Sequence, residues 1–293
     1  TDKSFMVDVI KLINSGAKVY AMVAPAISGQ FGADVNNGQI RQAIKALGFT
    51  DMYEVSLGAD FVSKNEALEL EEHVKEGKKM TTSCCPAFVN MIKKHFPQVL
   101  DAMSTTVSPM TATGRLIKAI DPEAVCVFIG PCIAKKGEVI DSITFGGADY
   151  AMTYEELASM FEAKDIDPAD FDGEMQQGSV FGMEFSVSGG VTNAVLSTFK
   201  ERNEDIDVKV CKANGALECK KALMMLKMGR LPEDFIEGMA CVGGCVNGPA
   251  MINKSRTYMK DRNAQIKKAD SRGVLENCSK YDDLEFSMVR NHQ

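Results

Sequence analysis

Nine cysteines in a chain of 293 residues are the side chains best able to bind a metal or react. Four of them lie in glycine- or proline-bearing turns, within TSCCPAF at 82–88, GPCIAKKGE at 130–138 and EGMACVGGCVNGP at 237–249. These four are Cys85, Cys132, Cys241 and Cys245. Turns of this kind can aim several thiolates at one centre, and a tetrahedral set of thiolates suits zinc or an iron–sulfur cluster.

The spacing of these four cysteines separates the possible sites. Cys241 and Cys245 form C-x3-C, which lies within the range of structural zinc sites, but Cys85 and Cys132 each stand alone in the sequence. Any single one could be a buried core thiol, because free cysteine is often buried. Four cysteines in turns of the same kind favour a shared metal cluster over four unrelated core thiols.

The composition narrows the class of protein. The formal net charge of -7 argues against a general nucleic-acid binder, which needs basic stripes or patches. No apolar run reaches the roughly 18 residues of a membrane span, so we expect no membrane partner. No secretory signal is recognised, and clustered cysteines in odd number are typical of a reducing compartment. We therefore expect a cytoplasmic protein without a disulfide framework.

Short apolar runs alternate with longer amphipathic segments along the chain. Strands are predicted at 18–24, 52–57, 124–129 and 206–210, and helices at 36–47, 60–76, 87–95, 153–163, 189–199 and 216–228, with another opening at Ser108-Pro109. The acidic segment 165–178 reads as a mobile loop and as the one candidate domain boundary. Alternation of this kind predicts an α/β fold with mainly parallel sheets, whose sites gather in loops beyond the strand ends.

The three cysteine segments resemble the signature loops of the hydrogen-cluster (H-cluster) domain of the iron-only, or FeFe, hydrogenases. Further matches fall in family order over residues 17 to 255 or so: VAPA at 23–26, Ser108-Pro109, Lys135-Lys136 with Glu138, and Glu184-Phe185 followed by Gly189-Gly190-Val191. The resemblance implies one catalytic domain over 1–293. Within it we expect two lobes of mainly parallel sheet flanked by helices, at about 17–140 and 141–265, a C-terminal extension, and the metal cofactor buried between the lobes.

The resemblance also implies a cofactor. Cys85, Cys132, Cys241 and Cys245 would ligate a 4Fe–4S cubane, and Cys245 would bridge it to a diiron subsite carrying carbonyl, cyanide and an amine-bearing dithiolate (azadithiolate). Because maturation proteins build the diiron unit, an unmatured protein would hold 4Fe–4S alone. The remaining expected cofactor contacts are a Lys135 hydrogen bond to one cyanide, Met239 beside the diiron site, and Ala24, Pro25, Ala26, Ser108 and Pro131 around it.

A proton route is implied by a second group of residues. Cys84, beside Cys85, matches the family's non-ligating cysteine that passes protons, and Glu66, Glu69 and Ser104 match its relay residues. Glu66, Glu69 and His73 also share one helix face by spacing, although such a triplet alone is more typical of a solvated helix face. His73 stands where family members usually have arginine, and it is a candidate for the outer entry point.

Electrons must also reach the site. The chain holds no cysteine motif before Lys18 for additional clusters, and the other cysteines show no ligand spacing: Cys126, Cys211, Cys219 and Cys278. We therefore expect either direct exchange with an external carrier such as ferredoxin or an N-terminal domain that this sequence does not include. The segment 253–268 contains six Lys or Arg and one acidic residue, so it is a candidate dock for an acidic carrier, or simply a solvated basic helix. The oligomeric state is not indicated.

Three positions depart from the family pattern. Gly130 replaces a methionine, Met110 stands where glutamine is common, and the last loop ends Gly248-Pro249-Ala250 instead of in a glycine run. They suggest a divergent subgroup. The leading interpretation is an FeFe hydrogenase that reversibly reduces protons to hydrogen. Its alternatives are a non-catalytic iron–sulfur relative serving redox or hydrogen sensing or cluster assembly, and a structural zinc protein; the proton-route residues favour the enzyme.

Overall fold

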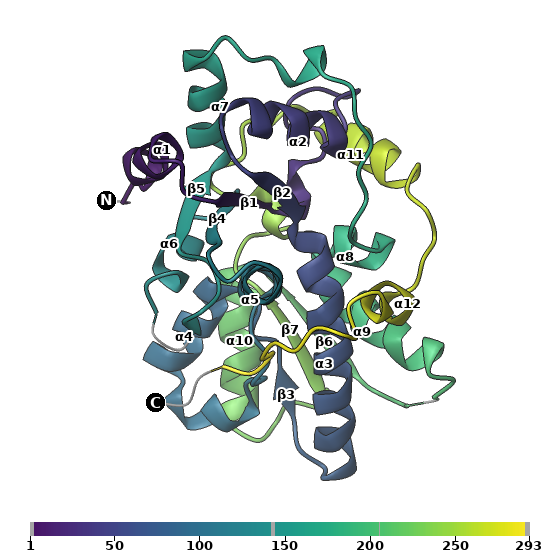
Figure 1. Ribbon diagram of the computed structural model, residues 1–293. Coiled ribbons are helices and arrows are strands. Elements are labelled where there is room, and N and C mark those ends of the chain that lie inside the picture. The colour runs from purple at the N-terminus through teal and green to yellow at the C-terminus, as the bar shows by residue number, and fades with distance from the viewer. Residues whose placement is uncertain (1–2, 142–143, 205, 291–293) are drawn as a thin grey trace.

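The computed structural model describes residues 3–141, 144–204 and 206–290, and it contains two parallel sheets (Figure 1). The first has the strand order β2 (Asp51–Glu54), β1 (Val19–Val23), β4 (Val125–Gly130), β5 (Tyr150–Thr153). The second has the order β3 (Met80–Thr81), β7 (Phe235–Met239), β6 (Val210–Asn214). The predicted α/β class with two mainly parallel, helix-flanked sheets is confirmed.

Helices cover the first sheet, and their ends follow from local sequence. The helix α2 (Asn37–Ala46) starts with a capping box between Asn36 and Gln39, and α7 (Tyr154–Ala163) starts with one between Thr153 and Glu156. Pro109 opens α5 (Pro109–Ile120), where a proline ring fits the first turn. Together with α1 (Met6–Asn14), these helices bury the apolar strands in one core.

The second sheet lies between two pairs of helices. On one side, α4 (Pro86–His95) and α10 (Ala216–Lys227) pack through Phe88, Ile92 and Leu223. A separate cluster joins α3 (Val55–Lys75) and α9 (Gly190–Glu201) to the sheet through Leu70, Phe199 and Phe235. Both faces of the strands are therefore buried, as is usual for a parallel sheet.

The long helix α3 runs from the first sheet down the length of the second (Figure 1). The expected strand at 52–57 was wrong at its end, since the strand stops at Glu54 and the helix begins at Val55 instead of at residue 60. Val55 and Leu57 lie in a helix turn that is buried all round, and such a turn has no burial period that distinguishes it from a buried strand. A Cβ at Gly58 would lie 2.3 Å from the carbonyl oxygen of Pro109, so glycine permits the close approach of α5.

The expected strand at 206–210 was also misplaced, because the strand β6 covers 210–214. Ile206 and Val208 do pack against the α3–α9 cluster, but from an irregular segment. Along the chain the two sheets interleave: β3 at 80–81 belongs to the second sheet and β5 at 150–153 to the first. A cut between residues 140 and 141 therefore does not separate the sheets.

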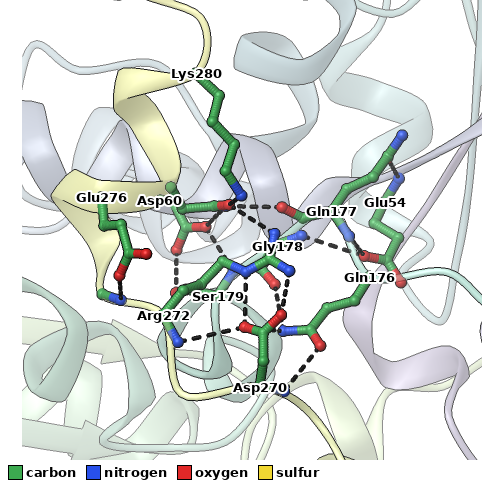
Figure 2. A network of polar contacts seen from close by, with 12 residues as sticks. Glu54, Asp60, Gln176, Gln177, Gly178, Ser179, Asp270, Arg272, Glu276 and Lys280 are labelled. Carbon is green, nitrogen blue, oxygen red and sulfur yellow. Dashed lines mark hydrogen bonds and ion pairs between the residues drawn. The ribbon is translucent and has the colours of Figure 1, made fainter.

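The acidic segment 165–178 is fixed at its end by buried carboxylates, contrary to the mobile loop that we expected (Figure 2). Glu54 accepts hydrogen bonds from the N–H groups of Gln177 at 2.6 Å and Gly178 at 3.2 Å. Asp60 accepts from the N–H of Ser179 and from Asn277 Nδ2, both at 2.7 Å. The segment thus closes over the start of α3.

Short elements complete the chain: α6 (Ala134–Glu138), α8 (Val180–Glu184), α11 (Tyr258–Ile266), α12 (Val274–Ser279) and the 3-10 turns Pro25–Ile27, Pro97–Ala102, Pro168–Asp170 and Cys245–Asn247. After α12 the chain crosses in front of α3 on its way to the C-terminus of the protein (yellow in Figure 1). Among the described residues, no helix combines the length and the apolar character that crossing a bilayer requires.

Candidate metal centre

One pocket lies where strand ends from both sheets meet. The strands β1 and β4 of the first sheet and β3 and β7 of the second each lead directly into a loop that lines it. Its empty space is about 820 Å³, and its walls are mostly apolar apart from cysteines and Lys135. Ligand sites of parallel sheets are found at this edge, so the four loops are placed for one shared site.

The four cysteines of the turn motifs all line this pocket. Cys85 is the N-cap of α4 with Pro86 in the first turn, and the positive end of a helix dipole favours a thiolate. Cys132 follows β4 through Pro131, whereas Cys241 and Cys245 follow β7 in one loop. Within the described ranges, no three His, Cys, Asp or Glu side chains are arranged to enclose a single metal ion.

The thiols act on one another electrostatically. Burial, and then the neighbouring Cys85, raise the pKa of Cys132 to about 11. The pKa of Cys245 is raised by burial and then by Cys132, Cys85 and Cys241, and that of Cys241 by burial and then by Cys85. All four side chains line the same pocket, where thiolates require a positively charged partner.

Two glycines shape the pocket wall. Gly244 has φ +97°, and a Cβ there would lie 2.5 Å from the carbonyl oxygen of Ser186, so only glycine allows the loop between Cys241 and Cys245 to pass. A Cβ at Gly130 would lie 2.5 Å from the ring of Phe128, which itself lines the pocket. At this position, where the family pattern has methionine, the ring of Phe128 therefore occupies the space next to Gly130.

Lys135 is a buried cation at the pocket wall. Its Nζ donates to Glu138 Oε2 at 2.7 Å and to the carbonyl oxygen of Cys84 at 3.4 Å. Ser108 donates to the other oxygen of Glu138, as does the Thr111 hydroxyl at 3.3 Å. Glu138 therefore neutralises Lys135 and fixes its position, and Ser108 acts one contact behind the pocket instead of lining it.

Behind Cys84 lies a fully buried carboxyl group. Cys84 lines the pocket, and burial and then the charge of Glu66 raise the pKa of its thiol well above the usual range. Burial, then the charge of Glu69, raises the pKa of Glu66 to about 8. The N–H of Ser83 and the hydroxyl of Ser104 counteract this rise, but among the described residues neither Glu66 oxygen has a partner in hydrogen-bond geometry.

Further from the pocket, the carboxylate of Glu69 accepts hydrogen bonds from residues 104–106. The hydroxyl of Ser104 donates to Glu69 Oε2 at 2.7 Å, and the N–H of Thr105 donates to Oε1 at 2.7 Å. Glu69 is partly exposed, and the Nδ1 atom of His73 lies 2.8 Å from its backbone oxygen, not from its carboxylate. The structure therefore brings Cys84, Glu66, Ser104 and Glu69 into one zone from pocket to surface.

Other expected residues have mixed positions. Ala24, Pro25, Pro131 and Met239 line the pocket, but the Ala26 carbonyl instead accepts a hydrogen bond from Tyr258 at 3.0 Å. Three further residues of the pocket wall were not predicted: Val55, Ala59 and Ser186. They lie on α3 and after α8, outside the cysteine motifs, and only the tertiary fold brings them to the pocket. Cys126, Cys219 and Cys278 are buried free thiols away from the pocket, and Cys211 is partly buried.

The basic segment at 253–268 carries one cation fewer at its surface than its sequence indicates. Arg262 is 1% exposed and donates to the Met183 carbonyl at 2.8 Å and to Ser186 Oγ at 3.1 Å. Its buried guanidinium fastens α11 to the loop behind the pocket. The other five basic residues of the segment are exposed: Lys254, Arg256, Lys260, Lys267 and Lys268.

Comparison with known proteins gives consistent results. A family model described as "Iron only hydrogenase large subunit, C-terminal domain" matches residues 17–249. Iron hydrogenase 1 of Clostridium pasteurianum is 30% identical over 85% of the chain, which spans 52% of that protein. Nuclear prelamin A recognition factor of Homo sapiens is 25% identical over 76% of the chain and 61% of its own length. The FeFe hydrogenase HydA1 of Chlamydomonas reinhardtii has the same fold, with TM-score 0.75, 21% identity and coverage of 96% and 94%.

Proposed function

Since the chain belongs to the family of the iron-only hydrogenase large subunit, C-terminal domain, we propose that it is a hydrogenase that reversibly reduces protons to molecular hydrogen. The chain spans about half the length of Iron hydrogenase 1, so this activity is proposed for the domain and any partner it needs. The observation that carries the proposal is the sequence of proton-holding groups between Cys84 at the pocket and Glu69 at the surface.

The pocket fits the cofactor that the family implies. Four cysteines on the wall of one pocket suit a cationic iron–sulfur group, and the remaining lining is nearly all apolar. Cys85, Cys132, Cys241 and Cys245 would hold the cubane, with Cys245 also bridging to the diiron unit. When bound, the cofactor supplies the redox chemistry that combines two protons and two electrons into hydrogen.

The chain's own residues exclude water and deliver protons. Met239, Phe128 and Pro25 keep the pocket dry, which strengthens each polar contact inside it. Lys135, held by Glu138, offers a donor to an anionic ligand of the cofactor. Cys84 Sγ holds the proton nearest the pocket, and Glu66 replaces it from Glu69 and Ser104. A carboxyl group with a pKa near 8 can both take and release a proton near neutral pH.

The second candidate is a non-catalytic iron–sulfur protein of the same family. Similarity to nuclear prelamin A recognition factor favours it, because that relative shares the fold region without being named a hydrogenase. A protein that only binds or senses clusters has no need for Cys84, Glu66, Ser104 and Glu69 to lie in one zone. We therefore rank it second.

An acidic electron carrier of the ferredoxin type is the proposed redox partner. The five exposed cations at Lys254, Arg256, Lys260, Lys267 and Lys268 form a basic surface that would attract such a carrier and raise its association rate. Maturation proteins would supply the diiron unit. We propose a cytoplasmic location, because none of the nine cysteines forms a disulfide, and thiols and metal-bound thiolates persist in reducing compartments.

Infrared spectroscopy of protein expressed with the maturation proteins tests this function. Bands from iron-bound carbonyl and cyanide, together with hydrogen formation from a reduced carrier, are expected. A protein that contains iron and sulfide but shows no such bands and no hydrogen would be the non-catalytic relative. Elemental analysis that finds zinc in place of iron would exclude both.

A further inference from the structure

The last described residues, 284–290, form a C-terminal strap that crosses the proton route. The N–H of Val107 donates to the Met288 carbonyl at 2.8 Å, and Val289 pairs with Thr106 in an antiparallel bridge. Phe286 stacks edge-on against Phe61 of α3 with ring centroids 5.1 Å apart. The strap lies outside residues 17–249, the range matched by the family.

Arg290 is the last residue of the strap, and it contacts both the loop that contains Ser83 and the loop that contains Thr105. Its Nη2 donates to the Ser83 carbonyl at 2.5 Å, next to Cys84, and its backbone N–H donates to the Thr105 carbonyl at 2.8 Å. The N–H of Thr105 in turn donates to Glu69 at 2.7 Å. Arg290 therefore contacts the backbone next to Cys84 and the backbone of Thr105, the residue whose N–H binds Glu69.

The guanidinium of Arg290 and the carboxyl group of Glu66 complement each other. Within the described part of the chain, Arg290 Nε and both Glu66 oxygens are buried without a hydrogen-bond partner. The pKa of Glu66 is raised by burial and by Glu69, and it is lowered by Ser83, Ser104 and Arg290. Arg290 is the only cation among these influences, and Cys84 is the titratable neighbour on the pocket side.

We propose that Arg290 is a positioning residue of the proton route, which holds a positive charge beside Glu66 and closes the route with the C-terminal strap. The role in turnover rests on the proposed function, but the electrostatic link between Arg290 and Glu66 does not. A buried carboxyl group that relays protons must ionise, and ionisation in a dry site needs a nearby cation. Without Arg290, Glu66 would bind its proton more tightly, and the relay would need a higher pH to release it.

Arg115 provides a matched control, because its guanidinium fastens the same strap. It donates to the carbonyls of Ser287 and Val289, both at 2.8 Å, but it is not among the groups that act on Glu66. Replacing Arg115 should loosen the strap without removing the charge beside Glu66. The comparison of Arg115→Gln with Arg290→Gln thus separates anchoring from electrostatics.

The test is an infrared titration of the Glu66 carboxyl group in protein without cofactor, with the band assigned by its loss in Glu66→Gln. Arg290→Gln should raise the proton affinity of Glu66 about tenfold, and Arg290→Lys should bring it back toward wild type. Arg115→Gln should lower thermal stability and leave the titration in place. An unchanged titration in Arg290→Gln, or an equal change in Arg115→Gln, would overturn the proposal.

The pH dependence of hydrogen oxidation in matured protein extends the test to turnover. Because oxidation needs an ionised Glu66 to accept the outgoing proton, its acidic limb should move to higher pH in Arg290→Gln and return in Arg290→Lys. If the carboxyl titration moves but matured wild-type protein shows no turnover, the link between Arg290 and Glu66 stands and the proposed function fails. A titration that moves without any change in the pH profile would overturn the role of Arg290 in the route.

Discussion

Lys135 Nζ lies 2.7 Å from Glu138 Oε2, and both side chains are almost fully buried at the wall of the cysteine pocket. The carboxylate removes the cost of a buried ammonium group while leaving the ammonium able to donate to another acceptor. Ser108 and Thr111 at the start of α5 saturate the far side of Glu138. The position of Lys135 is thus set by the first turn of a helix that lies outside the cysteine motifs.

Glu138→Gln should therefore destabilise the protein by about 3 kcal/mol, because it leaves a buried cation without a counter-charge. Urea denaturation of the protein without cofactor measures this change. The change in stability can be compared with that of Glu156→Gln, which removes the carboxylate partner of the neighbouring lysine of α6, Lys136, at 3.1 Å. An effect on stability at Glu138 no larger than about 1 kcal/mol would mean that Lys135 is solvated.

Adjacent cysteines should behave differently when each is replaced. Cys84→Ala should reduce hydrogen turnover by about 100-fold or more, because it removes the proton donor nearest the pocket, and iron content should stay at the wild-type level. Cys85→Ala should lose iron, because it removes a ligand at the start of α4. Iron and sulfide analysis together with a hydrogen assay distinguishes the two. Full turnover in Cys84→Ala would refute its assigned role.

The buried carboxyl group of Glu66 should make stability depend on pH. Its pKa is raised from 4.5 to about 8 in the fold, so the folded state keeps a proton that the unfolded chain releases between these values. The free energy of unfolding should therefore fall as pH rises through that window, by at most about 1.4 kcal/mol per pH unit, and level off above it. Below pH 4.5 both states are protonated and the penalty vanishes.

Glu66→Gln cannot ionise, so it should be increasingly more stable than wild type from about pH 5 to about pH 8. Urea denaturation at both pH values checks this. Glu72→Gln is the control, because Glu72 is exposed on the same helix and is not among the groups that act on Glu66. A stability difference between Glu66→Gln and wild type that does not vary with pH would show that the carboxyl group is ionised in the folded state.

The cysteine loops could be predicted from the sequence because their signals are local. Gly130-Pro131 before Cys132 and Gly243-Gly244 before Cys245 mark turns at strand ends, and parallel strands bring such turns to one edge. The ends of strands were harder to predict from the sequence where the residues on all sides are buried. Val55 and Leu57 read as strand residues, since a fully buried helix turn and a buried strand share an apolar run.

Other parts of the site depend on contacts between distant segments, which no local pattern reveals. Arg290 reaches Ser83 from the far end of the chain, and Asn277 reaches Asp60 from α12. Arg262 looked like a surface cation because its neighbours in sequence are charged, but its guanidinium is buried and donates to the carbonyl of Met183. Such buried polar contacts are set by tertiary packing.

Two basic surfaces compete as the dock for the electron carrier. The first is the exposed part of 254–268. The second adjoins Cys241, where Val242 is 68% and Leu217 is 86% exposed, and α10 places Lys220 and Lys221 on the same face as Leu217. Both would attract an acidic protein, and salt would weaken the attraction at either.

Charge reversal at the first surface, with Lys254, Arg256 and Lys260 all changed to Glu, should raise the apparent KM for a reduced ferredoxin about tenfold or more and weaken its salt dependence, because it removes the attraction that speeds encounter. The matched triple replacement by Glu covers Lys220, Lys221 and Lys212, an exposed residue of β6, the strand on which α10 packs. It should have a smaller effect. Assays with a small uncharged electron donor should show wild-type rates for both variants. If the second triple variant shows the larger increase in apparent KM, the carrier docks beside Cys241 instead. An apparent KM for ferredoxin that is equal in wild type and both variants would exclude electrostatic docking.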